Sequence, residues 1–319
     1  MKVSVLGCGR WGSFIAWYLN KIGKEVVLWG REGSPRFEAL RATRRNPVIS
    51  FEESILLTSD LSRALESATV ILAISAQQLR GFCKRLSACP LEGKTLVLCM
   101  KGLEISSGKR LSEVVEEELS GRGVHVAIWV GPGHVQDFAQ GIPNCMVIDS
   151  AEDAVKRSLV HAFSSDLIRF YYGTDLIGNE LGAAAKNVVG IAAGMLDGLG
   201  RSSLKGALMS RGTREISRLI GAMGGNAISA YGLAHLGDYE ATLFSPHSHN
   251  RRFGELFVRG ESYDELAEGV STAAAIVALA QKHGVELPIC EAVNAIVNRG
   301  ADPEQTLSNL FLRSLKEEF

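Results

Sequence analysis

The sequence predicts an α/β fold in two parts: a doubly wound, mostly parallel sheet in the N-terminal half and an all-α C-terminal domain. Three observations support this prediction. The 319 residues exceed the length at which single hydrophobic cores stop growing, and 46% of them are hydrophobic. Short β-branched runs alternate with helical patterns in the first half. The strand signal ends near Tyr172, and only helical patterns follow.

Each expected element follows from its hydrophobic pattern. Short Val-, Ile- and Leu-rich runs predict strands over residues 2–6, 25–29, 69–74, 95–99, 124–130 and 144–148. Helical periodicity between them predicts helices over residues 11–22, 77–86, 107–119 and 151–163. In the second half it predicts helices over residues 175–199, 204–223, 271–283, 289–298 and 303–315. A boundary near Asp175 therefore divides a nucleotide-type domain, 1–174, from a helical domain, 175–319.

Composition excludes several classes of protein. The formal net charge is −1, which argues against a nucleic-acid binder or a membrane-surface binder. Six cysteines are scattered without paired spacing, so we expect reduced thiols in a cytoplasmic protein. The N-terminus runs directly into a strand pattern rather than a signal peptide. No window approaches 18 uninterrupted apolar residues, so no stable membrane insertion is expected.

A glycine-rich run follows the first predicted strand. Gly7-Cys8-Gly9-Arg10-Trp11-Gly12 has the spacing G-x-G-x-x-G between a strand and a helix, which is the setting of a dinucleotide site in a Rossmann-type domain. Gly7 permits the tight turn, Gly9 lets the backbone approach a pyrophosphate, and Gly12 lets helix and strand pack closely. The helix N-terminus would face the phosphates. A plain glycine turn, or a flavin-binding or S-adenosylmethionine-binding version, is the alternative.

The end of the second predicted strand bears on the choice of cofactor. The chain there reads Trp29-Gly30-Arg31-Glu32. An arginine suits the 2′-phosphate of NADP, whereas an acidic residue suits the ribose hydroxyls of NAD. Arg31 therefore favours NADP, and Glu32 keeps NAD open. Arg31 as a solvated loop cation is the alternative interpretation.

One lysine lies in an unusual helix. The stretch from Asn179 to Gly194 is small and apolar on nearly every face, as in a helix buried among other helices. Asn179, Ala183, Lys186 and Gly190 share one stripe of it. Burial lowers a lysine pKa, and so does a neighbouring cation, which makes an amine usable as an acid or base near neutral pH. A surface lysine on an alanine-rich helix is the alternative.

Two further polar features accompany Lys186. Lys101 follows a predicted strand, and ligands of open parallel sheets collect beyond such strand ends. Asp238 precedes the run Ser245 to Gly254, which is rich in hydroxyl, amide and cationic groups just before an expected helix start. That setting suits a phosphate. The alternative is an exposed polar loop in which Ser248 or Asn250 caps the helix.

These residues together resemble the NAD(P)-dependent glycerol-3-phosphate dehydrogenase family, over nearly the whole chain. The matching segments are Gly7 to Gly12, Lys101 to Glu104, Gly131-Pro132, Glu180 to Asn187, Asp197 to Gly200, Gly237-Asp238, Ser248 to Gly254, Glu268-Gly269 and Val285 to Ile289. The ordered set is far more specific than any one of its members.

The resemblance implies a role for each site residue. Lys186 would exchange the proton of the substrate C2 hydroxyl. Lys101 would polarise the same oxygen or hold the substrate, and Asp238 would orient Lys186 and a substrate hydroxyl. The resemblance also implies contacts with a small phosphorylated three-carbon substrate by Lys101, Gly131, Gly133, Lys186, Asp238, Thr242, Ser248, His249 and Asn250. It implies contacts with NADP or NAD by Gly7, Gly9, Arg10, Trp11, Gly12, Arg31, Lys101, Val135, Asn250 and Glu268. A homodimer that supplies glycerol 3-phosphate for phospholipid synthesis is the family's usual form and task.

Several positions depart from the family pattern, among them Ser75, which stands where a proline is usual, and two of them bear on the phosphate. The family has an arginine between Ser248 and Asn250 as its main phosphate ligand, and this chain has His249. A serine is usual where Gly133 stands. Histidine matches a permanent bidentate clamp only when it is protonated. The departures predict a weaker phosphate grip above pH about 7, unless Arg251 or Arg252 reaches over.

Other functions stay open on the sequence alone. A dehydrogenase for another short keto or hydroxy phosphate or acid would share much of the pattern. A non-catalytic NAD(P)-binding sensor is the alternative of a different class, although it would have no reason to keep two lysines and Asp238. His235, Asp238, His247 and His249 lie close in sequence but do not form a recognised ligand frame, so no metal is expected.

Overall fold

The computed structural model describes residues 1–312, which form two compact units. The first, here called the sheet unit, contains Met1–Met100 and Lys109–Leu176. The second, the helical unit, contains Lys101–Gly108 and the chain from Ile177 onward. The short segment Lys101–Gly108 therefore packs with helices that come much later in the sequence, which no local pattern indicated.

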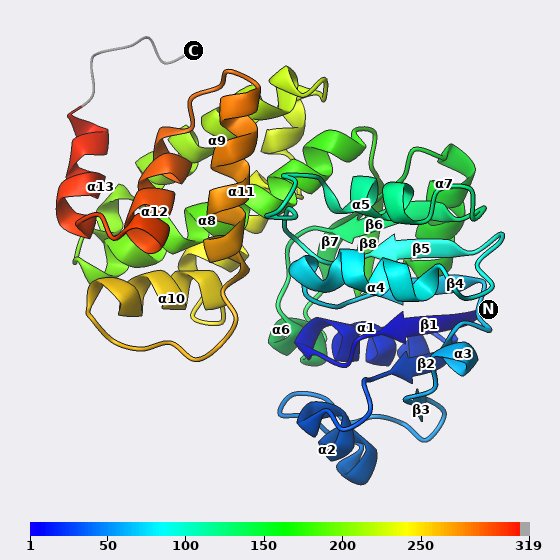
Figure 1. Ribbon diagram of the computed structural model, residues 1–319. Helices are drawn as coiled ribbons and strands as arrows, with labels where there is room; N and C mark the ends of the chain where they lie inside the picture. Colours follow the sequence, from blue (N-terminus) through cyan, green and yellow to red (C-terminus); the bar gives the residue numbers. More distant parts are fainter. Residues whose placement is uncertain (313–319) are drawn as a thin grey trace. The chain divides into compact units, whose positions relative to one another are not determined.

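The sheet unit is built on one sheet with the strand order β3-β2-β1-β4-β5-β6-β7-β8 (Figure 1). Its strands are β1 (Lys2–Leu6), β2 (Glu25–Trp29), β3 (Leu56–Thr58), β4 (Thr69–Leu72), β5 (Thr95–Leu98), β6 (His125–Val130), β7 (Asn144–Asp149) and β8 (Ile168–Tyr172). All neighbours pair in parallel except β6 and β7. The order from β3 to β6 is that of a dinucleotide-binding sheet, which confirms the predicted α/β class. All six predicted strands are present, whereas β3 and β8 were not predicted.

Helices cover this sheet on both faces. They are α1 (Arg10–Lys21), α2 (Pro35–Thr43), α3 (Leu61–Ala64), α4 (Leu79–Leu86), α5 (Leu111–Glu118), α6 (Val135–Ala139) and α7 (Asp153–Phe163). Trp129 of β6 packs against Tyr18 of α1 and Phe163 of α7, with ring centroids 6.0 and 5.7 Å apart. Val97 of β5 belongs to this core, and its neighbour Leu98 is also buried. Because successive strand side chains point to opposite faces, both faces are covered.

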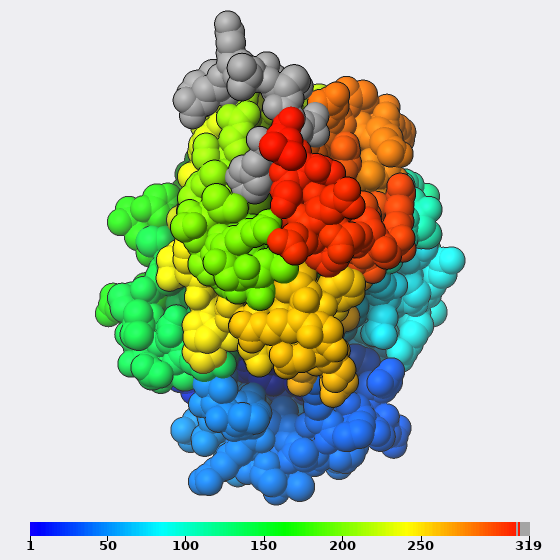
Figure 2. All heavy atoms as spheres, turned by 90° about the vertical axis from the view of Figure 1, so that its left-hand side faces the viewer, coloured from blue at the N-terminus to red at the C-terminus, as the bar shows by residue number. Residues whose placement is uncertain are grey.

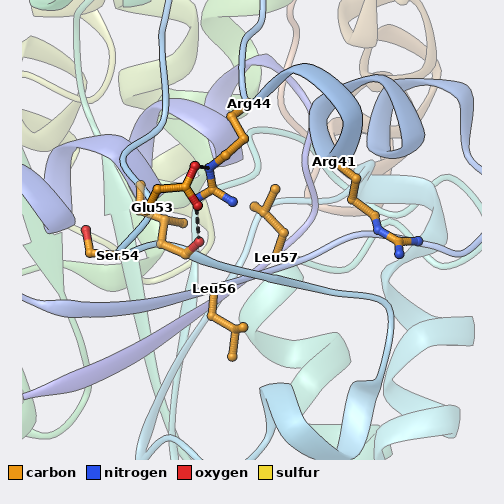
Figure 3. A pocket seen from close by; sticks show the side chains of 7 residues that line it. Arg41, Arg44, Glu53, Ser54, Leu56 and Leu57 are labelled. Carbon is orange, nitrogen blue, oxygen red and sulfur yellow. Dashed lines mark hydrogen bonds and ion pairs between the residues drawn. The ribbon is translucent and has the colours of Figure 1, made fainter.

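A pocket in the sheet unit lies beside α2 (Figure 3). Arg44 ends this helix with a left-handed φ of 49°. Its guanidinium donates to the carbonyl oxygens of Glu52 and Ile55 and pairs with Glu53. These bonds fasten the loop that leads into β3. The pocket contains none of the residues predicted for the functional site, so we assign Arg44 a structural role.

The helical unit is arranged around one long buried helix. Its helices are α8 (Leu176–Gly198), α9 (Lys205–Ala222), α10 (His249–Val258), α11 (Glu268–Lys282), α12 (Pro288–Arg299) and α13 (Pro303–Phe311). Every residue of α8 from Gly178 to Leu196 is buried, as its small apolar composition predicts. The predicted helix over residues 303–315 ends at Phe311, and residues 313–315 lie outside the described part of the chain.

The last described helix is held by the turn after α8. Arg201 donates to Ser308 at 2.9 Å and pairs with Glu304, both on α13. Figure 2 shows α13 in red beside the yellow-green chain near residue 200. All six cysteines are free thiols. Within residues 1–312, no helix combines the length and apolar character needed to cross a membrane.

Candidate functional site

The predicted glycine turn joins β1 to α1 in the sheet unit. Gly7 has a φ of +120°, and a Cβ there would lie 2.3 Å from the carbonyl oxygen of Ala73. A Cβ on Gly12 would lie 2.0 Å from the carbonyl oxygen of Gly7. A Cβ on Gly9, in contrast, would meet nothing within 4 Å. No side chain caps the N-terminus of α1, and its first turn carries no acidic residue. This combination fits the phosphates of a dinucleotide.

The other predicted residues of the sheet unit lie along the same strand ends. β1, β2 and β6 run in one direction, so Gly7, Arg31 and Gly131 follow strands at the same edge of the sheet. Arg31 is exposed, which agrees both with a contact to the 2′-phosphate of NADP and with a solvated loop cation. Trp11 packs on Phe14, with ring centroids 5.0 Å apart. Arg10 is exposed at the start of α1. Gly133, close to Gly131, has a φ of +141°, and Val135 is buried at the start of α6.

The helical unit brings both predicted lysines to one carboxylate. Lys101 Nζ lies 2.7 Å from Asp238 Oδ2, and Lys186 Nζ lies 3.0 Å from the same oxygen. Lys186 also donates to Thr242 Oγ1 at 2.7 Å. The Asp238 and Lys186 side chains are 2% and 10% exposed, so the interpretation of Lys186 as a surface lysine is wrong. Asn187 donates to the Lys101 carbonyl at 3.3 Å and ties the two lysine-bearing segments together.

The surroundings of Lys186 lower its pKa to about 8. Burial is the main cause, because an ammonium loses its hydration there. The Asp238 carboxylate opposes this effect and raises the pKa, whereas the Lys101 ammonium lowers it further. An amine with this pKa exchanges a proton readily near neutral pH, as a general acid or base must.

The start of α10 places the next group of predicted residues. Ser248 is the N-cap and accepts from the Arg251 amide at 3.3 Å, so of the two N-cap candidates the structure has Ser248. Asn250 Oδ1 accepts from the backbone amide of Gly269, next to Glu268 at the start of α11. A Cβ on Gly190 of α8 would lie 2.7 Å from Thr242 and 3.4 Å from Asn250. Asn250 is therefore close to Thr242, the hydrogen-bond partner of Lys186.

His249 has a partner that the sequence did not indicate. Its Nδ1 lies 2.5 Å from the hydroxyl of Tyr263, in the chain between α10 and α11. Arg251 does not take over the role of the family arginine, because its guanidinium contacts Asp197 at 2.7 Å and Glu255 at 3.2 Å. Arg252 pairs with Glu255 at 3.3 Å. His249 thus stays the candidate for the phosphate.

The four residues considered for a metal have other arrangements. His235 is fully buried and hydrogen-bonded to the Gly182 carbonyl and to Tyr239. Asp238 is occupied by the two lysines. Among residues 1–312, no group of three or more His, Cys, Asp or Glu side chains is arranged to hold a metal ion.

Sequence comparisons identify relatives along the whole chain. The model described as NAD-dependent glycerol-3-phosphate dehydrogenase N-terminus matches residues 2–156, and the corresponding C-terminus model matches residues 175–308. A protein of Parvibaculum lavamentivorans named glycerol-3-phosphate dehydrogenase (NAD(P)+) is 36% identical over 99% of this chain and 98% of its own. A protein of the same name from Pelodictyon phaeoclathratiforme is 37% identical over 100% and 99%.

Solved structures agree with the sequence comparisons. A glycerol-3-phosphate dehydrogenase from Coxiella burnetii has a TM-score of 0.90 at 30% identity, over 98% of this chain and 99% of that one. The yeast protein, at a TM-score of 0.80 and 20% identity over 97% and 98% of the two chains, shows the shared fold. From its sequence and its fold, this chain belongs to the family of NAD-dependent glycerol-3-phosphate dehydrogenases.

Proposed function

We propose that the protein is an NAD(P)-dependent dehydrogenase that interconverts sn-glycerol 3-phosphate and dihydroxyacetone phosphate. The observation that carries the proposal is the cluster in which Asp238 holds two ammonium groups, one of them on a buried lysine with a pKa lowered to about 8. The enzymes to which the chain is similar carry this activity in their names. A site that only bound a nucleotide would have no use for a buried acid–base pair.

The cofactor would be held mainly by the sheet unit. The open side of Gly9 and the uncapped N-terminus of α1 fit a pyrophosphate, and Arg31 fits the adenosine end of NADP. We assign cofactor binding to Gly7, Gly9, Arg10, Trp11, Gly12, Arg31, Lys101, Val135, Asn250 and Glu268. When bound, NAD(P) supplies the hydride acceptor or donor.

Lys186 exchanges the proton of the reaction. In the oxidation of glycerol 3-phosphate, neutral Lys186 Nζ takes the proton of the C2 hydroxyl while the C2 hydrogen leaves with its electron pair. The C2–O bond becomes a carbonyl. In the reverse direction the Lys186 ammonium returns the proton to C2–O⁻. The Lys101 ammonium lies beside that oxygen and stabilises the negative charge that develops on it.

Asp238 and the start of α10 position the substrate. Asp238 holds both lysines through one oxygen, and Thr242 accepts a second hydrogen bond from Lys186. Ser248, His249 and Asn250 begin α10, whose N-terminal amides and dipole favour a phosphate. Gly131 and Gly133 complete the proposed substrate contacts from the sheet unit.

We assign residues 1–174 as the NAD(P)-binding domain and residues 175–319 as the substrate and catalytic domain. Lys101, Gly131 and Gly133 from the first range add substrate contacts, and Asn250 and Glu268 from the second add cofactor contacts. The six free thiols support a reducing compartment, the cytoplasm. A homodimer and the supply of glycerol 3-phosphate for phospholipid synthesis complete the proposal, by similarity to the family. Sedimentation equilibrium tests the dimer, which a monomeric mass would contradict.

Turnover tests the activity directly. Wild-type protein is expected to oxidise NADPH or NADH when dihydroxyacetone phosphate is added, and Lys186→Ala to lose about 10²- to 10⁴-fold in kcat. Lys156→Ala is the matched control, because Lys156 is also a buried lysine that donates to a carbonyl, that of Gly173, in the sheet unit. The control is expected to stay within a few-fold of wild type. A wild type without turnover, or a Lys186→Ala variant as active as the control, contradicts the proposal.

A further inference from the structure

Asp238 lies in a part of the chain that has little regular structure of its own. It ends a 3₁₀ turn, Leu236–Asp238, and a π-helical turn, Glu240–Phe244, carries Thr242. Short 3₁₀ and π turns have poorer hydrogen-bond geometry than α-helices. Yet Asp238 must place one oxygen within 3.0 Å of two lysines. Contacts from outside these two turns are therefore needed to hold Asp238 and Thr242 in place.

Two fully buried side chains flank Asp238 and form a pair. His235 Nδ1 lies 2.8 Å from the carbonyl oxygen of Gly182 in α8, and His235 Nε2 lies 2.7 Å from the Tyr239 hydroxyl. A carbonyl only accepts, so Nδ1 carries the proton and Nε2 accepts from Tyr239. Burial lowers the pKa of His235 to about 4, which keeps this neutral tautomer at physiological pH.

Two helices leave room for this pair by having glycine at the contact. A Cβ on Gly182 of α8 would lie 2.9 Å from the Cβ of His235. A Cβ on Gly212 of α9 would lie 3.0 Å from the Tyr239 hydroxyl. His235 is thus seated on α8, the helix that carries Lys186, and Tyr239 is seated on α9.

The pair is connected to the two residues that hold Lys186. The backbone amide of Asp238 donates to the His235 carbonyl at 3.0 Å. The backbone amide of Thr242 donates to the Tyr239 carbonyl, also at 3.0 Å. A displacement of either anchor therefore moves a direct partner of the Lys186 amine.

We propose that His235 and Tyr239 are positioning residues, which anchor the Asp238 and Thr242 turns to α8 and α9 and thereby set the place of the Lys186 amine. The inference rests on the proposed function for its effect on turnover, but its effect on Lys186 itself does not require turnover. Displacements of about 1 Å can cost up to about 10²-fold in rate. Removal of one buried hydroxyl is expected to cost less, about tenfold.

The test uses Tyr239→Phe, which removes only the hydroxyl, and Tyr18→Phe as the matched control. Tyr18 is also fully buried, and its hydroxyl donates to the Phe163 carbonyl in the sheet unit. Tyr239→Phe is expected to lower kcat about tenfold without changing KM for NADPH, and Tyr18→Phe to leave kcat unchanged. In an Asp238→Asn background the loss is expected to shrink, because Tyr239 acts partly through His235 on Asp238 and partly through Thr242. An equal loss in both backgrounds overturns the proposal.

A second measurement needs no turnover. Competitive acetylation of amines over a pH series, read by peptide mass spectrometry, gives the pKa of Lys186 in the full-length protein. We expect Tyr239→Phe and His235→Asn to lower that pKa, because the carboxylate that raises it is displaced. Tyr18→Phe is expected to leave it unchanged. A Lys186 pKa unchanged in both site variants overturns the proposal, even if the wild type shows no dehydrogenase activity, and its fall in either folded variant supports it.

Discussion

At the scale of single residues, Lys186 is governed by three opposing influences. Loss of hydration and the Lys101 charge favour the neutral amine, while the Asp238 carboxylate favours the ammonium. The sum leaves the pKa at about 8, close to the pH at which a cell operates. Without Asp238 the pKa of the amine would be lower still, and the amine would be neutral over most of the physiological range. Without burial the pKa would be higher, and the amine would keep its proton.

The pH dependence follows from this value. Oxidation of glycerol 3-phosphate needs the neutral amine, so its kcat/KM is expected to rise about tenfold per pH unit up to about pH 8 and then level off. Reduction of dihydroxyacetone phosphate needs the ammonium, so its kcat/KM is expected to fall above that pH. Initial rates in both directions measure the two profiles. Parallel profiles, with the same sign of slope, would show that Lys186 is not the proton carrier.

His249 is predicted to determine how tightly the protein binds the substrate phosphate. An imidazole held by Tyr263 offers at most one charged contact there, whereas an arginine offers two parallel ones. His249→Arg is therefore expected to lower KM for dihydroxyacetone phosphate about tenfold and to remove its rise above pH about 7. KM measured over a pH series checks this, with His247→Arg, an exposed neighbour, as control. A wild-type KM independent of pH would remove His249 from the phosphate site.

At the scale of elements, the β1–α1 turn has glycines of two different kinds. Gly7 and Gly12 are required by the fold, because a Cβ at either would overlap backbone. Gly9 is not, because a Cβ there meets open space. The fold therefore explains two of the three glycines, and the proposed cofactor explains the third.

This difference gives a paired prediction. Gly9→Ala is expected to leave the free energy of unfolding within about 1 kcal/mol of wild type but to raise Kd for NADPH at least tenfold. Gly12→Ala is expected to destabilise the sheet unit by about 2 kcal/mol or more, since helix and strand must move apart. Thermal unfolding and fluorescence titration with NADPH measure the two quantities. Unchanged NADPH binding in Gly9→Ala would place the pyrophosphate elsewhere.

At the scale of the whole molecule, two buried groups oppose each other as the pH changes. The pKa of Glu215 is raised to about 8 by burial; its Oε1 accepts from Ile289 at the start of α12, and its Oε2 has no partner among the described residues. An acid whose pKa is raised on folding contributes stability that is fully present below about pH 4.5 and is lost as the pH rises through about 8. His235, lowered from 6.5 to about 4, does the reverse, and its contribution is lost as the pH falls between those values.

The contributions of Glu215 and His235 to the pH dependence of stability cancel between about pH 4.5 and 6.5. Between about pH 6.5 and 8 only the contribution of Glu215 remains. Wild-type stability is therefore expected to fall there by up to about 1.4 kcal/mol per pH unit through this group. Glu215→Gln is expected to remove that slope, because the amide does not titrate. Urea unfolding at several pH values measures it, with Glu291→Gln as control for a neighbouring acid. An unchanged slope in Glu215→Gln would show that Glu215 titrates normally.

The sequence by itself determined the elements and the residue types of the site. Six strands, the long buried helix and the glycine turn follow from local periodicity and backbone sterics, which act over a few residues. The short elements β3 and α6 were missed, because three to five residues carry too little pattern. Lys186 was marked by a charge in an apolar helix. Asp238 was marked by its place ahead of a polar run, but its role came only from the resemblance.

The tertiary structure decided which of these residues meet. Lys101 and Asp238 are 137 positions apart and share an ion pair, and Lys186 and Thr242 are 56 apart and share a hydrogen bond. It also assigned Lys101–Gly108 to the helical unit and gave His235 and His249 their tyrosine partners. The physical reason is that these contacts are set by how helices pack, and packing depends on many side chains distant in sequence, which no local pattern records.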